Sequence, residues 1–305
     1  MTIDATDNWV TKVLIEEALR IIVRPAGQRI LKIIKRKWKP ETHWESRINK
    51  KYEGYFKVFN SISEEPNIEI DGKYPLTKSQ KSAATAIRRK LRTDGRPNDQ
   101  HAILTDLPNW GDSPLTLHVK TLDFADLKAL RNEGHRPMVL SSCVVLLCRK
   151  SKELIVQRRS VHVDTYKNAL HTFGGAFIPP SGVDPDRKKL SKTVKREVNE
   201  EIQISIDWKN PPPMIMSQEV KTGFIQLVVL GVNIDEESLI KYNNNWEGDL
   251  VKIKYSQLEG ILHDQSWVHS GIGHILSWLA YGAPNAGLMA KFGDLSAREL
   301  FNKIV

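Results

Sequence analysis

The spacing of apolar residues predicts a chain in which helices and strands alternate. Apolar side chains three or four positions apart are typical of amphipathic helices, and unbroken runs of branched aliphatic residues are typical of buried strands. Turns that contain proline or glycine separate these stretches. We expect helices at 9–23, 28–38, 78–91, 124–132, 187–202, 256–263, 271–281 and 295–304, and strands at 116–120, 139–148, 153–158, 204–207, 214–220, 224–234 and 250–255.

The order of these segments indicates the fold class and the domain organisation. Strands and helices are mixed along the chain, which predicts an α/β fold. The run FIQLVVLGVNI at 224–234 is the most strand-like and is expected to be a central strand. Residues 61–71 are expected to form a loop. We place a boundary near residue 100, between a basic, partly helical extension or small domain at 1–99 and a domain at 100–305, which has a lead-in strand and helix and C-terminal helices.

The predicted helix at 187–202 carries three carboxylates beside an apolar stripe. The stripe consists of Leu190, Val194 and Val198. These residues are four positions apart, so their side chains share one face of the helix. Like charges three or four positions apart repel by about 0.2–0.5 kcal/mol even at a helix surface, and an unpaired buried charge costs far more. We therefore expect a positive group among them, and Mg²⁺ or Mn²⁺ suits carboxylate oxygens better than zinc does. The carboxylates belong to Glu197, Glu200 and Glu201.

This helix resembles part of a known motif. The segment REVNEE at 196–201 is similar to the R-E-U-x-E-E core of the Nudix box, and Gly174 and Gly175 are similar to the glycine pair that opens the box. Three features depart from the pattern: Lys188 stands where the first glutamate is expected, Gln203 stands where the last glycine is expected, and the spacing between the halves is about seven residues longer. The resemblance covers roughly residues 135–282.

The resemblance to the Nudix superfamily implies a fold and an activity. The fold is an α/β/α sandwich with a mixed sheet, here preceded by the basic N-terminal extension. The activity is that of a Mg²⁺- or Mn²⁺-dependent pyrophosphatase, which hydrolyses a diphosphate bond in a nucleoside diphosphate linked to another moiety. Glu197, Glu200 and Glu201 would hold the metal, which lowers the pKa of the attacking water. Either Glu197 or a later loop acid such as Glu247 would take the proton from that water, with Asp249 and Glu219 as further candidates by position.

Two arginines at a predicted strand end are candidates for binding the diphosphate. Arg158 and Arg159 precede the glycine-rich approach at Gly174 and Gly175, and guanidinium groups bind phosphate in a bidentate manner. Glycines permit close contact with the backbone. Because neighbouring residues of a strand point to opposite faces of a sheet, we expect one of the two arginines, not both, to face the substrate.

The positive charge of the chain is concentrated in its first third. Of the formal net charge of +9, residues 1–100 contribute 21 Lys/Arg against 13 Asp/Glu. Such a surface is compatible with binding nucleic acid, an anionic membrane or a phosphorylated ligand, and equally with a solvated basic face. The alternative function is therefore a Nudix-fold nucleotide sensor or interaction protein without turnover, whose basic N-terminus binds nucleic acid or a partner.

The remaining composition indicates an intracellular globular protein. Cys143 and Cys148 lie in one apolar run and are expected to be buried thiols rather than a disulfide or zinc site. The chain has no secretory signal and no apolar run of the roughly 18 residues that a transmembrane helix needs. We expect a cytoplasmic location. The apolar N-terminal helices are compatible with a homodimer.

Overall fold

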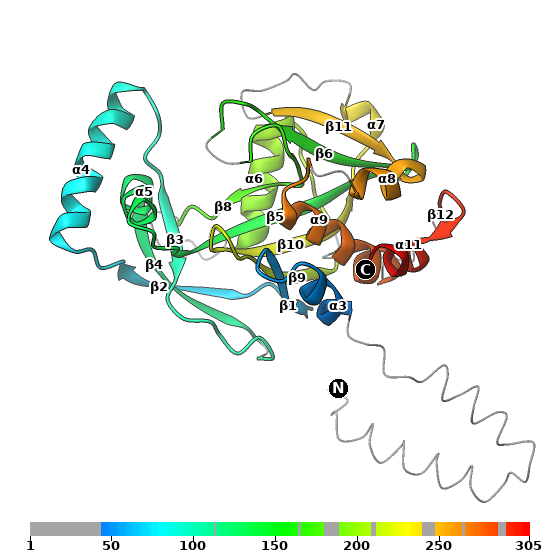
Figure 1. The fold of residues 1–305 in the computed structure, drawn as a ribbon, viewed down its shortest axis with the longest axis horizontal. Helices are drawn as coiled ribbons and strands as arrows, with labels where there is room; N and C mark the ends of the chain where they lie inside the picture. The colour runs from blue at the N-terminus through cyan, green and yellow to red at the C-terminus, as the bar shows by residue number, and fades with distance from the viewer. Residues whose placement is uncertain are drawn as a thin grey trace, which may run out of the picture. The chain divides into compact units, whose positions relative to one another are not determined.

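The computed structural model describes residues 44–112, 114–163, 166–179, 189–208, 212–239, 248–263, 266–285 and 291–305 (Figure 1). Contacts between Cα atoms divide the chain into two compact units, Met1–Trp44 and Glu45–Val305. The helices expected at 9–23 and 28–38 lie outside the described residues. No helix in the described parts of the second unit is long and apolar enough to cross a bilayer.

Strand β5 (Met138–Cys148) is the strand around which the sheet is built. One of its edges pairs in parallel with β10 (Phe224–Asn233), which pairs on its other side with antiparallel β9 (Met214–Glu219). The run at 224–234 is therefore an interior strand, as predicted. The other edge of β5 is shared along its length by three antiparallel strands, namely β3 (Gln100–Leu104), β8 (Phe173–Ala176) and β6 (Glu153–Arg159).

The outer strands extend the sheet in both directions to give the order β1-β9-β10-β5-β3-β4-β2. β11 and β7 pair with β6 away from this path, and β12 and β13 form a separate hairpin. Both parallel and antiparallel pairs occur, so the sheet is mixed. These strands are β1 (Phe56–Ile62), β2 (Asn67–Lys73), β4 (Thr116–Asp123), β7 (Leu170–His171), β11 (Gly248–Lys254), β12 (Lys291–Phe292) and β13 (Leu295–Ser296).

Most expected helices are present with bounds close to those predicted from the sequence. The helices expected at 78–91, 124–132, 187–202, 256–263, 271–281 and 295–304 correspond to α4, α5, α6, α8, α9 and α11. The last turn of α9 continues as a π-helical turn at Trp278–Gly282. The helices are α3 (Trp44–Lys51), α4 (Lys78–Thr93), α5 (Phe124–Asn132), α6 (Leu190–Ile202), α7 (Glu236–Leu239), α8 (Leu258–Leu262), α9 (His269–Ser277), α10 (Ala283–Asn285) and α11 (Ala297–Ile304).

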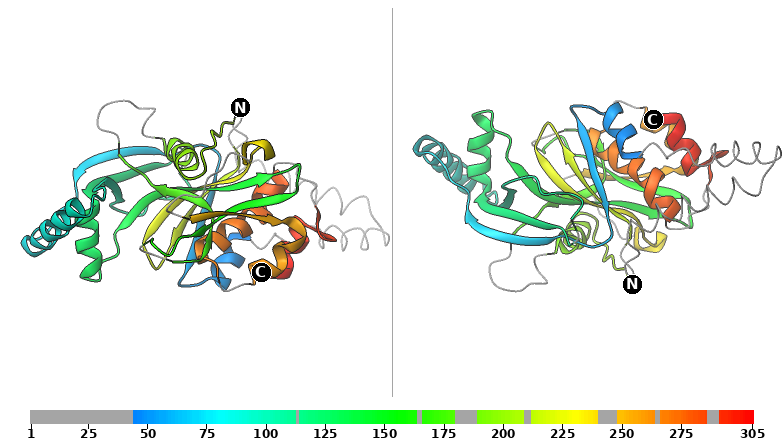
Figure 2. Two further views of the ribbon diagram at one scale, coloured as in Figure 1. Left: turned by 90° about the horizontal axis from the view of Figure 1, so that it is seen from above. Right: turned by 90° about the horizontal axis from the view of Figure 1, so that it is seen from below.

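Helices cover both faces of the sheet. Figure 2 shows α6 on one side of the central strands and α9 on the other. The apolar stripe of α6 packs in one core cluster with alternate residues of β5, among them Val144 and Leu146. On the opposite face, Trp278 is fully packed beside Gly231 of β10, where an added Cβ would lie 2.9 Å from the indole nitrogen. The α/β fold with a mixed sheet is confirmed.

Two local predictions are wrong, and both have a physical reason. Residues 61–71 are not a loop, because β1 and β2 occupy most of this segment, and the polar composition of β2 reflects its place at the sheet edge with only Ile68 buried. Residues 204–207 form no strand, since Ile204 and Ile206 enter the core without pairing. Strand β3 was not predicted.

Residues before position 100 contribute to the same sheet as the later residues. β1 pairs with β9, and β2 pairs with β4. The division of the chain into domains at 1–99 and 100–305 stays a prediction about independent folding, and the contact-based division falls at residue 44 instead.

Candidate active site

Helix α6 directs its carboxylates by burying its apolar stripe. Leu190, Val194 and Val198 have no exposed surface, so the helix cannot rotate on the sheet without exposing them. Glu201 lies on the buried side and is 6% exposed, whereas the side chains of Glu197 and Glu200 are 15% and 57% exposed. The stripe deduced from the sequence therefore sets a gradient of burial across the three carboxylates.

Both ends of α6 depart from ordinary capping. The residue before the helix, Lys189, provides no side-chain cap. Instead Glu65, from the turn between β1 and β2, accepts hydrogen bonds from the backbone N–H and the hydroxyl of Ser191 at 2.6 and 2.8 Å. At the other end Gln203 has a left-handed backbone with φ of 56°, a conformation usually given to glycine. Lys188, the other departure from the Nudix pattern, lies outside the described residues.

The glycine pair of β8 makes room for backbone and carboxylate contacts. Gly174 has φ of 152°, and a Cβ there would lie 2.2 Å from the carbonyl oxygen of Ser142. A Cβ on Gly175 would lie 2.3 Å from Cδ of Glu197, so the carboxyl group lies directly against the strand. Any side chain at either position would displace one of these groups.

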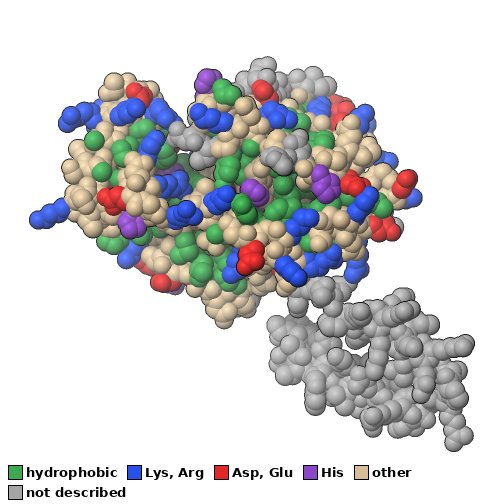
Figure 3. All heavy atoms as spheres, viewed as in Figure 1, with side chains coloured by type: hydrophobic (Ala, Val, Ile, Leu, Met, Phe, Trp, Pro, Cys, Tyr) green, Lys and Arg blue, Asp and Glu red, His purple; other side chains and the backbone are tan. Residues whose placement is uncertain are grey.

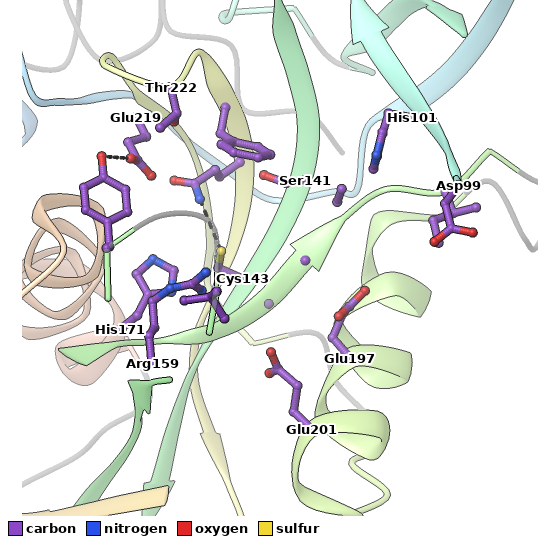
Figure 4. A pocket seen from close by; sticks show the side chains of 18 of the residues that line it. Asp99, His101, Ser141, Cys143, Arg159, His171, Glu197, Glu201, Glu219 and Thr222 are labelled. Carbon is purple, nitrogen blue, oxygen red and sulfur yellow. Dashed lines mark hydrogen bonds between the residues drawn. The ribbon is translucent and has the colours of Figure 1, made fainter. Parts of the chain in front are cut away.

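A cavity of about 440 Å³ brings most of the predicted site residues together (Figure 4). Its wall includes all three α6 carboxylates, both glycines of β8 and Arg159. Arg158 lies outside this wall, and its Nη1 donates a hydrogen bond to the carbonyl oxygen of Asn168 at 3.1 Å. The expectation that neighbouring arginines face different ways therefore fits the geometry, with Arg159 on the cavity side.

Glu219, at the end of β9, is a buried acid in the same wall. It is 5% exposed, and its carboxylate accepts hydrogen bonds from the hydroxyl of Tyr166 and, at 3.0 Å, from that of Ser270. Burial raises the pKa of the Tyr166 phenol, as does its bond to Glu219. The hydroxyl of Ser270, in α9, also lies 3.1 Å from Nε2 of His171, in β7. One polar network therefore joins α9, β7 and the end of β9.

A second buried chain of hydrogen bonds includes two residues of the cavity wall, Gln226 and Cys143. The hydroxyl of Thr172 and the side-chain oxygen of Gln226 lie 2.7 and 3.2 Å from the two ring nitrogens of His274, which has no exposed surface. Gln226 in turn donates to the thiol of Cys143 at 3.4 Å. Burial lowers the pKa of His274 well below its usual range and lowers that of His171 to about 3, so both rings are neutral near pH 7.

The carboxylate donors suit a hard divalent cation in their chemistry. Carboxylate oxygens of α6 line the cavity, and Gly175 leaves space beside one of them. Among the described residues, however, no three acidic, histidine or cysteine groups gather closely enough to form a metal site. The guanidinium of Arg196 supplies part of the positive charge that a cation would bring. It donates a hydrogen bond to Glu197 at 2.5 Å and lies 3.8 Å from the carboxylate of Glu200.

The predicted proton acceptor Glu247 lies outside the described residues. Asp249, the next acid along the chain, is exposed on β11 opposite Arg158. Sequence position makes Glu219 a candidate acid, whereas nothing in the sequence singles out Tyr166. Their contact depends on the packing of distant segments.

Comparison with known proteins gives matches in structure only. No protein-family model matches the chain, and neither does any curated protein. A MutT protein from Methanosarcina mazei Go1 has 18% identity and a TM-score of 0.34, with 46% of this chain and 93% of that one covered. A MutT NUDIX hydrolase from Burkholderia pseudomallei has 10% identity and a TM-score of 0.30, with 44% and 95% covered.

A third match is a larger protein. It is a bifunctional NMN adenylyltransferase/ADP ribose pyrophosphatase from Francisella tularensis, with 17% identity, a TM-score of 0.34, and 50% of this chain and 44% of that one covered. At these identities and scores, the function of the chain has to be inferred from its own residues and their geometry.

Proposed function

We propose that the chain is a Nudix-type pyrophosphatase that hydrolyses a diphosphate bond in a nucleoside diphosphate linked to another moiety, with Mg²⁺ or Mn²⁺. The observation that carries this proposal is one cavity wall formed by the carboxylates of α6, the glycine pair of β8 and Arg159. An acidic wall opposed by a guanidinium matches a substrate that carries both metal and phosphate. Arg196 and the three glutamates of the wall belong to the segment REVNEE, whose order of residues resembles the Nudix box.

Each wall residue has a role in this proposal. Glu197, Glu200 and Glu201 would hold the metal, which when bound neutralises the diphosphate and lowers the pKa of water. Arg159 would bind a phosphate oxygen, and the backbone at Gly174 and Gly175 would approach the diphosphate closely. Either Glu197 or Glu247 would accept the proton of the attacking water.

The test is turnover of a panel of diphosphate compounds by the wild type, Glu200→Gln and Glu201→Gln. The panel contains ADP-ribose, sugar nucleotides, dinucleoside polyphosphates and nucleoside triphosphates, each with Mg²⁺ or Mn²⁺. We expect turnover of at least one compound and a loss of about 100-fold or more in kcat in both variants, because an amide removes the charge that holds the metal. Glu259→Gln, on the surface helix α8, is the matched control and should keep wild-type turnover.

A nucleotide sensor without turnover is the second candidate. It is favoured by the ion pairs of Arg196, which already neutralise part of the carboxylate wall without a metal. Binding of one panel compound with no hydrolysis under any metal condition would favour this reading. Hydrolysis that survives in Glu200→Gln and Glu201→Gln would reject the proposed metal site.

The basic surface offers a further contact for such a sensor. Lys and Arg side chains gather over the lobe that carries α4 (Figure 3), whose sequence KSQKSAATAIRRKLRT has no acid. Within the described residues, Arg88 of this helix forms ion pairs with Asp123 and Asp126. Nucleic-acid binding by this face would weaken steeply with added salt.

A further inference from the structure

The outer surface of α4 carries cations that have no acidic partner. The sequence of this helix, KSQKSAATAIRRKLRT, contains six Lys or Arg residues and no acid. Five of the six form no ion pair with any acid in the part of the chain that the structure describes. Their positive field is therefore left to attract anions from solution. The five cations are Lys78, Lys81, Arg89, Lys90 and Arg92.

Contacts with α5 fix which face of α4 points outward. Gln80 and Leu91 are among the buried residues of α4, so the opposite face of the helix is turned to solvent. Gln80 donates a hydrogen bond to Glu133 at the end of α5, at 2.9 Å, and Arg88 donates one to Asp123 at the start of α5, at 2.8 Å. The two helices are thus antiparallel and joined near both ends. Figure 1 shows α4 on the outer side of its lobe, with α5 on the inner side.

Four of the free cations form two pairs on one side of α4. Lys78 and Lys81 are three positions apart, as are Arg89 and Arg92, so the members of each pair are neighbours on the helix surface. Eleven residues, close to three full turns, separate the pairs, which therefore point the same way and lie about 16 Å apart along the helix axis. Short side chains occupy the exposed positions between them, namely Ser82, Ala83, Thr85 and Ala86.

A recess beside the first pair gives an anion a place to enter. Its volume is about 590 Å³, and its wall contains Lys81 of α4 and Lys73 at the end of β2. Arg88 lies in the same wall, where its ion pairs with Asp123 and Asp126 already neutralise both acids. Two ammonium groups remain for a ligand, and Lys side chains are common partners of nucleic-acid phosphates.

The side chains of this face distinguish between kinds of nucleic acid. Proteins that bind single strands stack the bases on aromatic rings, and α4 has no aromatic residue. A helix in the major groove of DNA reads base edges, commonly with Arg, Asn or Gln, but α4 has only short side chains between its cation pairs. The minor groove of duplex RNA is wide and shallow, and proteins contact its phosphates and 2′-hydroxyls rather than its base sequence. Cation pairs with short polar side chains between them suit that groove.

We propose that α4 and the recess beside it form an RNA-binding face, which binds duplex RNA across its minor groove. The cation pair at each end of the helix contacts phosphates on one side of the groove, and Ser82 and Thr85 lie over the 2′-hydroxyls between them. The RNA-binding face goes beyond the proposed function and does not rest on it, because α4 contributes no residue to the wall of the active-site cavity.

The test is fluorescence anisotropy with the full-length chain. A labelled RNA duplex of about 20 base pairs, longer than the span that one RNA-binding module covers, is compared with the DNA duplex of the same sequence and with the single RNA strand. We expect the RNA duplex to bind most tightly of the three, with an affinity that falls steeply between 50 and 200 mM salt.

Two double variants remove one cation pair each. Lys78→Gln/Lys81→Gln and Arg89→Gln/Arg92→Gln should each lower the affinity for the RNA duplex about tenfold or more. Each should also reduce the slope of log affinity against log salt by about two, because two phosphate contacts are lost. Glutamine favours helices and the positions are exposed, so both variants should melt as the wild type does.

Two further variants make the result specific. Lys252→Gln/Lys254→Gln removes the same charge from exposed positions of β11, outside the cavity and the recess, and should bind the RNA duplex as the wild type does. Ser82→Gln keeps the charge of α4 and lengthens a side chain between the cation pairs. It should weaken binding several-fold, because the helix can no longer approach the groove closely.

The outcomes separate this face from its alternatives. Equal losses in the α4 variants and in the β11 variant would show a diffuse attraction to charge and overturn the proposal. The absence of RNA binding, or DNA and single strands bound as tightly as the RNA duplex, would overturn it too, as would binding of phosphatidylserine vesicles in preference to RNA. Lost RNA binding in the α4 variants, with diphosphate turnover as in the wild type, would support a face separate from the active site.

Discussion

The carboxyl group of Glu197 is held between a strand that has no side chain and a guanidinium. Gly175 leaves the space on one side, and Arg196 donates a hydrogen bond on the other. At the scale of single residues, the position of this carboxylate therefore depends on the absence of one Cβ atom.

Substitution of that glycine tests the dependence. In Gly175→Ala the added Cβ would lie 2.3 Å from Cδ of Glu197, far inside van der Waals contact, so the carboxylate has to move. A displacement of about 1 Å in a reacting group can cost about 100-fold in rate, and we expect a loss of that size in kcat/KM. Steady-state kinetics on the best diphosphate substrate measures it.

The control is Gly260→Ala, in α8, where an added Cβ meets no atom within 4 Å. This variant should retain wild-type kinetics and should be at least as stable, because alanine favours a helix over glycine. Wild-type kcat/KM in Gly175→Ala would show that the position of Glu197 does not limit the reaction.

Single residues can be predicted from the sequence where a local pattern singles them out. Glu197, Glu200 and Glu201 follow from helical periodicity and from the resemblance to the Nudix box. Alternation predicts that only one of Arg158 and Arg159 faces the cavity, but the side is decided by the pairing of β6 with β11 and β7. The contact between Tyr166 and Glu219, by contrast, depends on tertiary packing of segments 53 residues apart, which no local pattern reports.

At the scale of elements, the start of α6 is held by a residue from a distant part of the chain. Glu65 precedes Ser191 by 126 positions and bonds to two of its donor groups. A carboxylate at this end also interacts favourably with the helix dipole. The orientation of the carboxylate helix is therefore linked to the turn between β1 and β2.

Removal of this cap should loosen the helix. For Glu65→Ala we expect a decrease of about 1 kcal/mol in the free energy of unfolding, the typical effect of losing a helix cap. Urea denaturation followed by circular dichroism measures the change. Glu64→Ala removes the exposed neighbouring acid and should leave stability as in the wild type. Equal stability of both variants would show that the bonds from Ser191 contribute nothing.

The buried histidines make stability depend on pH. The pKa of His171 is about 3 in the folded protein, against about 6.5 in the unfolded chain. Between these values the unfolded state binds a proton that the folded state does not, so the free energy of unfolding falls as pH falls below 6.5. The slope is up to about 1.4 kcal/mol per pH unit for each such histidine, and it vanishes above pH 7. His274, whose pKa is also lowered by burial, acts in the same direction.

Urea denaturation at pH 7.0 and pH 5.0 measures this slope. His274→Gln should show a smaller difference between the two values than the wild type, because one of the proton-binding groups is gone from the unfolded state. His263→Gln, at an exposed position after α8, removes a histidine outside the buried network. A wild type that is equally stable at both pH values would contradict the expected burial of neutral imidazoles.

At the scale of the whole molecule, β1 is an edge strand that completes the sheet and its core. Phe56 and Val58 are 1% exposed, and Phe56 packs so closely on α9 that a Cβ at Gly273 would lie 2.2 Å from its ring. The sequence predicted the Nudix-like half from 135 onward in most of its elements. It gave no reason to join 56–62 to 214–219, because only the complete fold brings these segments together.

Two fragments decide where the folding unit begins. Residues 45–305 contain every described strand, so we expect this fragment to melt cooperatively and to show the proposed hydrolytic activity to the same extent as the whole chain. Residues 100–305 lack β1 and β2, and we expect them to be insoluble or to lose cooperative melting, since the exposed edge of β9 and the bare face of α9 invite aggregation. Cooperative melting of 100–305 would instead support a domain boundary near residue 100.

The pairing of β1 with β9 also affects how the chain can fold while it is being synthesised. Phe56 pairs with Glu219, so the ribosome adds about 160 residues between the two partners. At typical rates of 5–20 residues per second, the partner of β1 is synthesised roughly 8–32 s later, and until then Phe56 and Val58 cannot be covered by it. Folding of the nascent chain therefore cannot finish from the N-terminus onward, and among the described strands β1 is the one that a chaperone has most time to bind.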